Sequence, residues 1–265
     1  MSILNLGSIP EGPLTLKINT LQRHYACFGS SGCGKTVLSK VLIEELASNG
    51  VPVIAIDPQG DIASLAELAD EGVAKQKGVD PKVRQKFSEN TEVVVWTPGS
   101  SKGMPICINP LQFDGVEELN AEDKIRYFSA TAKNIVNLIG YELDSDDGKS
   151  SEAVLSTLFE YCFNSNILLN SFKDVIQLIG NLPGPVEEVA GTVATGKFMR
   201  TLHKKLSLLN LGARKLIFHT GVPASIDTLL GLDGSTDKTR ISVIYLNTLH
   251  TAEEKNFFIS GICQL

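Results

Sequence analysis

One short segment has the residue types and spacing of a phosphate-binding loop. Residues 29–36 read GSSGCGKT, which satisfies the pattern GxxxxGK[ST]. Glycine in such a loop lets the backbone approach phosphate oxygens without a Cβ clash. The residues expected to surround the phosphates are Gly29, Ser30, Ser31, Gly32, Cys33, Gly34, Lys35 and Thr36.

The last two residues of this loop carry the specific chemistry. Lys35 is expected to contact the β- and γ-phosphates, and the Thr36 hydroxyl is expected to ligate Mg²⁺. The helix that begins near Lys35 would add its positive dipole end. The sequence therefore predicts binding of ATP with Mg²⁺.

A second candidate element is AIDPQGD at residues 55–61. Asp57 would end a strand at the ligand-binding edge of an open α/β sheet, where it could hold a Mg²⁺-bound water. Gln59 or Asp61 could then approach the γ-phosphate. The alternative is a strand-ending Asp-Pro turn without nucleotide contact.

A catalytic acid is missing from the pattern. Motor ATPases usually carry four apolar residues followed by Asp-Glu, and no such run occurs in this sequence. The apolar run 241–246 ends at Asn247, which would be either a sensor of the γ-phosphate or a turn residue.

Alternating strands and helices are expected to position these residues. We predict a strand over 24–28, a helix over 35–48 that Asn49-Gly50 ends, a strand over 51–57, a helix over 64–76 and a strand over 91–99. This alternation predicts an α/β fold with a doubly wound, mostly parallel sheet.

The middle of the chain changes character. Helical periodicity appears over 121–140, 150–164 and 171–182, with Ser150 and Ser171 as expected N-caps. Strands are expected over 215–221 and 239–247, and a helix begins the last segment. The expected organisation is a lead-in with a small β-element (1–23), a P-loop core (24–114), a mostly helical insertion (115–210) and a return to the core (211–265).

Composition is that of a globular protein, with 43% hydrophobic and 20% charged residues. The net charge of −6 does not favour nucleic-acid binding over the whole surface, although a pore needs only local basic residues. The five cysteines show no paired spacing, which argues against a zinc site. No apolar run approaches the ~20 residues of a membrane span, and no signal peptide is recognised, so a cytoplasmic location is expected.

The two motifs together resemble the HerA/FtsK group of ATPases, which includes conjugation and type IV secretion motors. GSSGCGKT is followed by a helix and then by VIAIDPQGD, as in that group. The lead-in LKINTLQRHYACFG and the later VPASIDTLLGLDG and TRISVIYLNTL are also similar to it. The resemblance covers roughly 14–114 and 214–265.

This resemblance implies a ring of about six subunits that threads DNA or protein through its pore. A neighbouring subunit would supply an arginine to the γ-phosphate, and Arg200, Arg214 and Arg240 are the candidates, with Arg23 less well placed. It also implies that the Asp-Glu strand lies beyond Leu265, so the chain would be an N-terminal part with poor activity alone.

Other resemblances and functions stay open at this point. ParA/MinD ATPases also carry Asp-Pro-Gln-Gly after the next strand, but have a lysine where this chain has Ser30. A GTPase would need an Asn-Lys-x-Asp motif, and Lys238 within STDKT is a poor substitute. A regulatory module that binds nucleotide without turnover is the non-enzymatic alternative.

Overall fold

The computed structural model describes residues 3–265 and divides into two compact units. The first unit contains Met1–Thr97, Lys102–Met104 and Ser225–Asn247, and the second contains Pro98–Ser101, Pro105–Ala224 and Thr248–Leu265. Each unit is described by itself below.

The main sheet confirms the predicted α/β class. Its strands follow the order β3 (Val53–Asp57), β7 (Thr239–Tyr245), β4 (Thr91–Pro98), β5 (Met104–Cys107) and β6 (Val222–Pro223). The pairs β3·β7, β4·β7 and β5·β6 are parallel. The strands predicted over 51–57, 91–99 and 239–247 are therefore confirmed, each to within two residues at either end.

The alternation of side chains along β7 explains how helices cover the sheet of the first unit. Ile241 and Val243 point to one face and join a core with Ala47 of α1 (Lys35–Ser48). Phe87 of α3 (Pro81–Asn90) packs against the same core. Ser242 points to the opposite face, where its hydroxyl donates to the Leu229 carbonyl of α10 (Ile226–Leu230) at 2.6 Å.

Helix α1 has the boundaries that the sequence predicts. It begins directly after Gly34, and Asn49 and Gly50 end it, with Gly50 at φ 83°. An antiparallel hairpin of β1 (Ile3–Ile9) and β2 (Gly12–Lys17) precedes the loop and is tied to α1, because the Asn5 amide donates to Glu45 at 2.8 Å. A short 3₁₀ helix, η1 (Ile18–Gln22), follows the hairpin.

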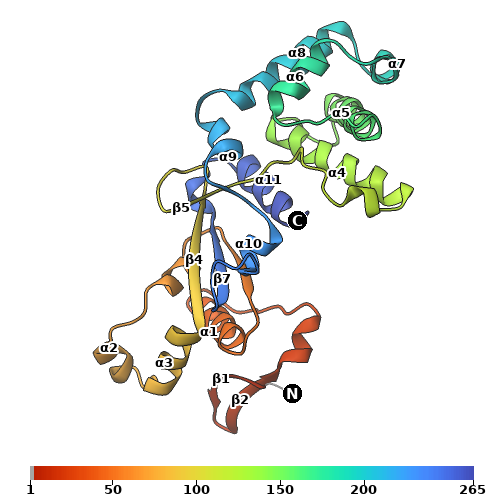
Figure 1. Cartoon of the computed structure of the whole chain (residues 1–265). Helices are drawn as coiled ribbons and strands as arrows, with labels where there is room; N and C mark the ends of the chain where they lie inside the picture. Colours follow the sequence, from red (N-terminus) through yellow and green to blue (C-terminus); the bar gives the residue numbers. More distant parts are fainter. Residues whose placement is uncertain (1–2) are drawn as a thin grey trace. The chain divides into compact units, whose positions relative to one another are not determined.

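The second unit is mainly helical. Its longer helices are α4 (Ala121–Leu138), α5 (Asp146–Asn164), α6 (Phe172–Gly180), α7 (Gly184–Val193), α8 (Gly196–Ser207) and α11 (Ala252–Ile262) (Figure 1). Phe113, Phe128 and Phe159 form one aromatic cluster, with ring centroids 5.3 and 5.8 Å from Phe113. The helices predicted over 121–140, 150–164 and 171–182 correspond to α4, α5 and α6.

Three predictions of local structure are wrong, two because a capping residue sets the helix boundary and one because an apolar run of this length fits a helix as well as a strand. Residues 215–221 form helix α9 (Lys215–His219) instead of a strand. The helix expected over 64–76 is interrupted, because Asp70 caps a separate helix, α2 (Glu71–Gln76), after the 3₁₀ helix η2 (Ile62–Ala66). Ser145, not Ser150, caps α5, whereas Ser171 caps α6 as predicted.

The strand expected over 24–28 is also absent from the described structure. These residues carry no strand assignment and pair with none of the described strands. The Phe28 side chain is 91% exposed, so the apolar run is not buried on either face. A strand needs a neighbouring strand to satisfy its backbone hydrogen-bonding groups. Residues 24–28 have no such neighbour among the described strands.

Candidate functional site

The loop at residues 29–34 adopts a conformation that depends on its glycines. Gly32 and Gly34 have φ values of 76° and 94°, in the left-handed region that side chains disfavour. A Cβ on Gly29 would lie 2.3 Å from the Cys33 sulfur, so alanine at that position would require the Cys33 side chain to rotate. The loop residues are solvent-exposed, and a ligand can reach them.

Lys35 closes this loop on itself. Its Nζ donates to the carbonyl oxygens of Gly29 at 2.9 Å and Ser30 at 2.7 Å, and lies 4.0 Å from the Cys33 sulfur. The ammonium group therefore lies against the backbone of the loop, next to the N-terminus of α1. An anion at this position would meet a cation and a positive helix end together.

Thr36 follows in the first turn of α1. It is half-buried, and its hydroxyl forms no hydrogen bond with any other residue of the described chain. A loop that needs glycine, a central lysine and a hydroxyl in the first helical turn fits the phosphates of a nucleotide with Mg²⁺. Lys35 would hold the phosphates and Thr36 would supply an oxygen ligand to the cation.

Asp57 organises the turn after β3. The side chain is 2% exposed, and its Oδ1 accepts from the Gly60 amide at 2.7 Å. Its Oδ2 accepts from the amides of Ile62 and Ala63, both at 2.9 Å. A carboxylate offers about four acceptor positions, so roughly one position on Oδ1 is left for a further donor.

The end of β7 supports the same turn. Asn247 Nδ2 donates to the Gln59 carbonyl at 2.9 Å, so Asn247 acts as a positioning residue for the turn. Gly60 has φ 92°, and a Cβ there would lie 2.7 Å from Cε2 of Tyr245. The β3 turn thus needs glycine at position 60 for two reasons, its conformation and the close approach of β7.

Asp61 lies on the exposed side of this turn. Its carbonyl accepts from the Ser64 hydroxyl at 3.1 Å, and Ser64 in turn accepts from Lys40 of α1 at 2.7 Å. The described polar link between the phosphate-loop helix and the Asp57 turn therefore runs through Lys40 and Ser64. Sequence reasoning missed both of these residues, because neither belongs to a motif.

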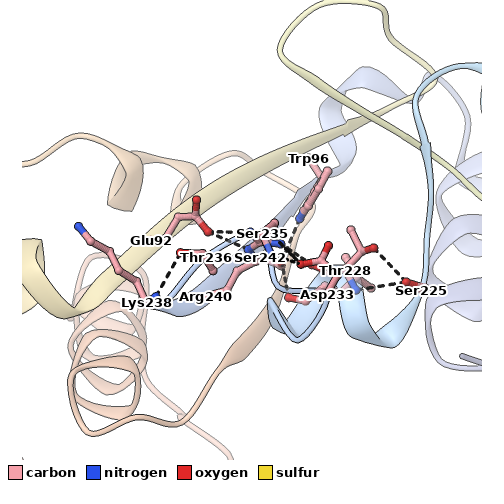
Figure 2. A network of polar contacts seen from close by, with 11 residues as sticks. Glu92, Trp96, Ser225, Thr228, Asp233, Ser235, Thr236, Lys238, Arg240 and Ser242 are labelled. Atoms are coloured by element: carbon pink, nitrogen blue, oxygen red, sulfur yellow. Dashed lines mark hydrogen bonds and ion pairs between the residues drawn. The ribbon is translucent and has the colours of Figure 1, made fainter.

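Arg240 is a structural residue, which corrects its candidacy as an arginine supplied to a neighbour. Figure 2 shows its guanidinium group inside a network at the start of β7. It bonds Glu92 at 2.8 and 2.9 Å and the Thr228 carbonyl at 2.8 Å. The side chain is 5% exposed and is therefore inaccessible to another subunit.

The other arginine candidates differ in their surroundings. Arg214 lies 3.9 Å from Glu254 in the second unit, in a loose ion pair. Arg200 is exposed on α8, and no described residue forms an ion pair or side-chain hydrogen bond with it. Arg23 is exposed, directly after η1.

The α/β sheet, the glycine-dependent loop and the Lys35–Thr36 pair together define a P-loop NTPase. The family described as "helicase HerA, central domain" matches residues 4–230, and the chain belongs to this family. It is thus a HerA/FtsK-like P-loop ATPase domain, as the motifs predict. A search of curated proteins finds no match to the chain.

Two further observations concern the rest of the described chain. None of the helices within residues 3–265 is long and apolar enough to cross a membrane. Over the same residues, His, Cys, Asp and Glu side chains form no cluster of three or more suited to a metal ion.

Proposed function

We propose that the chain binds ATP·Mg²⁺ at residues 29–36 and is the nucleotide-binding part of a HerA/FtsK-like ring motor. The observation that carries this proposal is the position of Lys35 Nζ on the carbonyls of Gly29 and Ser30. Phosphate oxygens would replace those carbonyls as the partners of the ammonium group. The backbone amides of the loop would hold the remaining phosphate charge.

Asp57, Gln59 and Asp61 have distinct proposed roles beside the phosphates. Asp57 holds the turn through three backbone amides and, at its remaining acceptor position, accepts from a Mg²⁺-bound water. Gln59 and Asp61, on the exposed part of that turn, orient water near the γ-phosphate. The Asn247 contact to the Gln59 carbonyl supports this placement by fixing the turn.

Assembly completes the proposed motor. Subunits contact one another head to tail and close into a ring of about six, through which DNA or protein moves. Arg200 is the proposed arginine that reaches a neighbour's γ-phosphate, because it is exposed and has no described partner. Such an arginine contributes roughly 10³–10⁵ in rate, so an isolated subunit would turn over slowly.

Nucleotide binding is tested by Lys35→Ala, with calorimetric titration of ATP in the presence of Mg²⁺. The variant should lose at least about tenfold in affinity and should keep its folded state, since the Lys35 side chain lies at the loop surface. Lys82→Ala, an exposed lysine of α3, is the matched control and should bind normally. Unchanged affinity in Lys35→Ala would remove the P-loop assignment.

The mode of assembly is tested separately, by native mass measurement with a non-hydrolysable ATP analogue. A species of about six subunits is expected, and Ser30→Ala should leave it intact because Ser30 carries no charge that could cross an interface. A nucleotide-dependent dimer without larger species would instead favour ParA-like face-to-face pairing.

A further inference from the structure

The helical unit contains a cavity of about 780 Å³ that the nucleotide site does not use. Residues of two segments line it, one from the loop after β5 into η3 (Val116–Glu118) and one from the end of α5 into the loop before α6. All of its lining residues belong to the second unit. Its volume is in the range of cavities that hold organic ligands or short peptide segments.

Uncharged amides dominate the polar lining. Gln112, Asn164, Asn166 and Asn170 are exposed at the cavity, and their side chains form no hydrogen bond with any described residue. Each such amide has one acceptor and one NH₂ donor group, which match the N–H and C=O of a peptide backbone. Several unpaired amides around one cavity thus suit a ligand with a repeating pattern of donors and acceptors.

Apolar side chains lie beside these amides. Leu168 is 79% exposed and Ile167 is 38% exposed, although both are large hydrophobic residues. Asn166 has φ 54°, the one positive value among non-glycine residues of the described chain, and this turn directs the segment after it. Phe113 adds an aromatic surface to the same cavity. A ligand with apolar side chains would cover this surface.

The charge of the lining selects among ligands. Asp114 and Glu117 are the acidic residues of the cavity wall, and no lysine, arginine or histidine is among the residues that line it. Lys124 is not among the lining residues, but its Nζ lies 5.5 Å from the centre of the Phe163 ring, and the two carboxylates outnumber this one ammonium group. Acidic walls disfavour phosphate polymers and favour a cationic group.

We propose that this cavity binds an extended peptide segment of a partner protein, with apolar side chains next to a lysine or arginine. The unpaired amides would bond the peptide backbone, Phe113 and Leu168 would contact the apolar side chains, and Asp114 with Glu117 would pair with the basic one. The proposal does not rest on nucleotide binding, so Lys35→Ala should leave peptide binding unchanged.

The first experiment uses an array of synthetic peptides of about nine residues, which span roughly 30 Å when extended. Val and Leu alternate with Ser, and the central residue is Lys, Ala or Glu. The whole chain should bind the Lys peptides at least about tenfold more tightly than the Glu peptides, measured by fluorescence anisotropy. Methylation of the peptide backbone nitrogens should remove binding, since it removes the donors that the amides require.

Variants then locate the binding. Asn164→Ala combined with Asn170→Ala should weaken binding of the Lys peptide at least about tenfold, whereas Asn181→Ala, an exposed asparagine outside the cavity, should not. If the double variant fails to fold, the side-chain NH₂ resonances of the unmodified protein report instead, and those of the cavity amides should shift with peptide.

Three outcomes would overturn the proposal. The first is an array in which no peptide binds. The second is binding that survives backbone methylation, which would indicate apolar adhesion alone. The third is a single-stranded oligonucleotide that binds the cavity and displaces the Lys peptide, which would identify a nucleic-acid site.

Discussion

Removal of the Asp57 carboxylate should destabilise the first unit more than any other change in the candidate site. Three backbone amides donate to it, at 2.7, 2.9 and 2.9 Å, and the side chain is 2% exposed. Hydrogen bonds to a charged group contribute about 1.5–3 kcal/mol each, but water that enters the vacated space would accept hydrogen bonds from some of these amides. We expect Asp57→Ala to lower the free energy of unfolding by about 3–4 kcal/mol.

Asp57→Asn should cost about half as much, roughly 1.5–2 kcal/mol, because one oxygen remains to accept from two of the three amides. Urea denaturation followed by circular dichroism measures both variants. Asp61→Asn is the matched control: it changes an exposed carboxylate in the same turn and should cost less than about 0.5 kcal/mol. A loss below about 1 kcal/mol in Asp57→Ala would show that the carboxylate does not hold this turn.

The same variants separate the two roles proposed for Asp57. If the remaining acceptor position also holds a Mg²⁺-bound water, then folded Asp57→Asn should require more Mg²⁺ for ATP binding than the wild type. If the carboxylate only stabilises the turn, then any higher Mg²⁺ requirement of Asp57→Asn should result from its lower stability. That difference from the wild type should then disappear at a lower temperature, where the variant is fully folded.

The remaining predictions concern reactivity, packing and turnover. Bound ATP·Mg²⁺ should protect the exposed Cys33 from iodoacetamide, and equal labelling with and without nucleotide would contradict this. Burial raises the pKa of Cys162 to about 11, so that thiol should stay unmodified at pH 8 in either state, as mass spectrometry can check. Arg240→Met should lower the free energy of unfolding by about 2–3 kcal/mol, because it breaks the ion pair and leaves a backbone carbonyl unpaired. The loss is limited because the Glu92 carboxylate is 36% exposed and stays partly hydrated. Gly60→Ala should destabilise by about 1–3 kcal/mol in thermal melts, since a Cβ meets an aromatic ring at 2.7 Å and φ is 92°; a neutral effect would mean that the turn can move. Arg200→Ala should lower ATP turnover of the assembled protein by ~10³ without changing ATP affinity, and unaltered turnover would remove Arg200 as the proposed arginine.

Local chemistry explains which elements could be predicted. Helix α1 was predictable at both ends. Gly34 directly before it and Gly50 just after it both have positive φ values, which a helix does not continue through. Strands β3 and β7 were predictable as continuous apolar runs, which is typical of strands covered on both faces. In these segments the signal is contained within a few neighbouring residues.

Other elements depend on distant residues, and their prediction was wrong for that reason. Residues 24–28 have the composition of a strand, but composition supplies no hydrogen-bonding neighbour. Residues 215–221 read as a strand, yet Ile217 and Phe218 are buried within a short helix. An apolar run of this length fits either a strand or a helix, and the packing partner decides between them.

The division between sequence and tertiary structure is clearest at the candidate site. The identity and spacing of residues 29–36 predict a P-loop, because the motif is local and its glycines, lysine and threonine lie close together in the sequence. Only the tertiary structure decided which roles Arg240 and Asn247 have. Arg240 is buried against Glu92, 148 residues away, and Asn247 bonds the Gln59 carbonyl, 188 residues away. No local pattern encodes such contacts, since they exist only after β4, β7 and β3 have come together in one sheet.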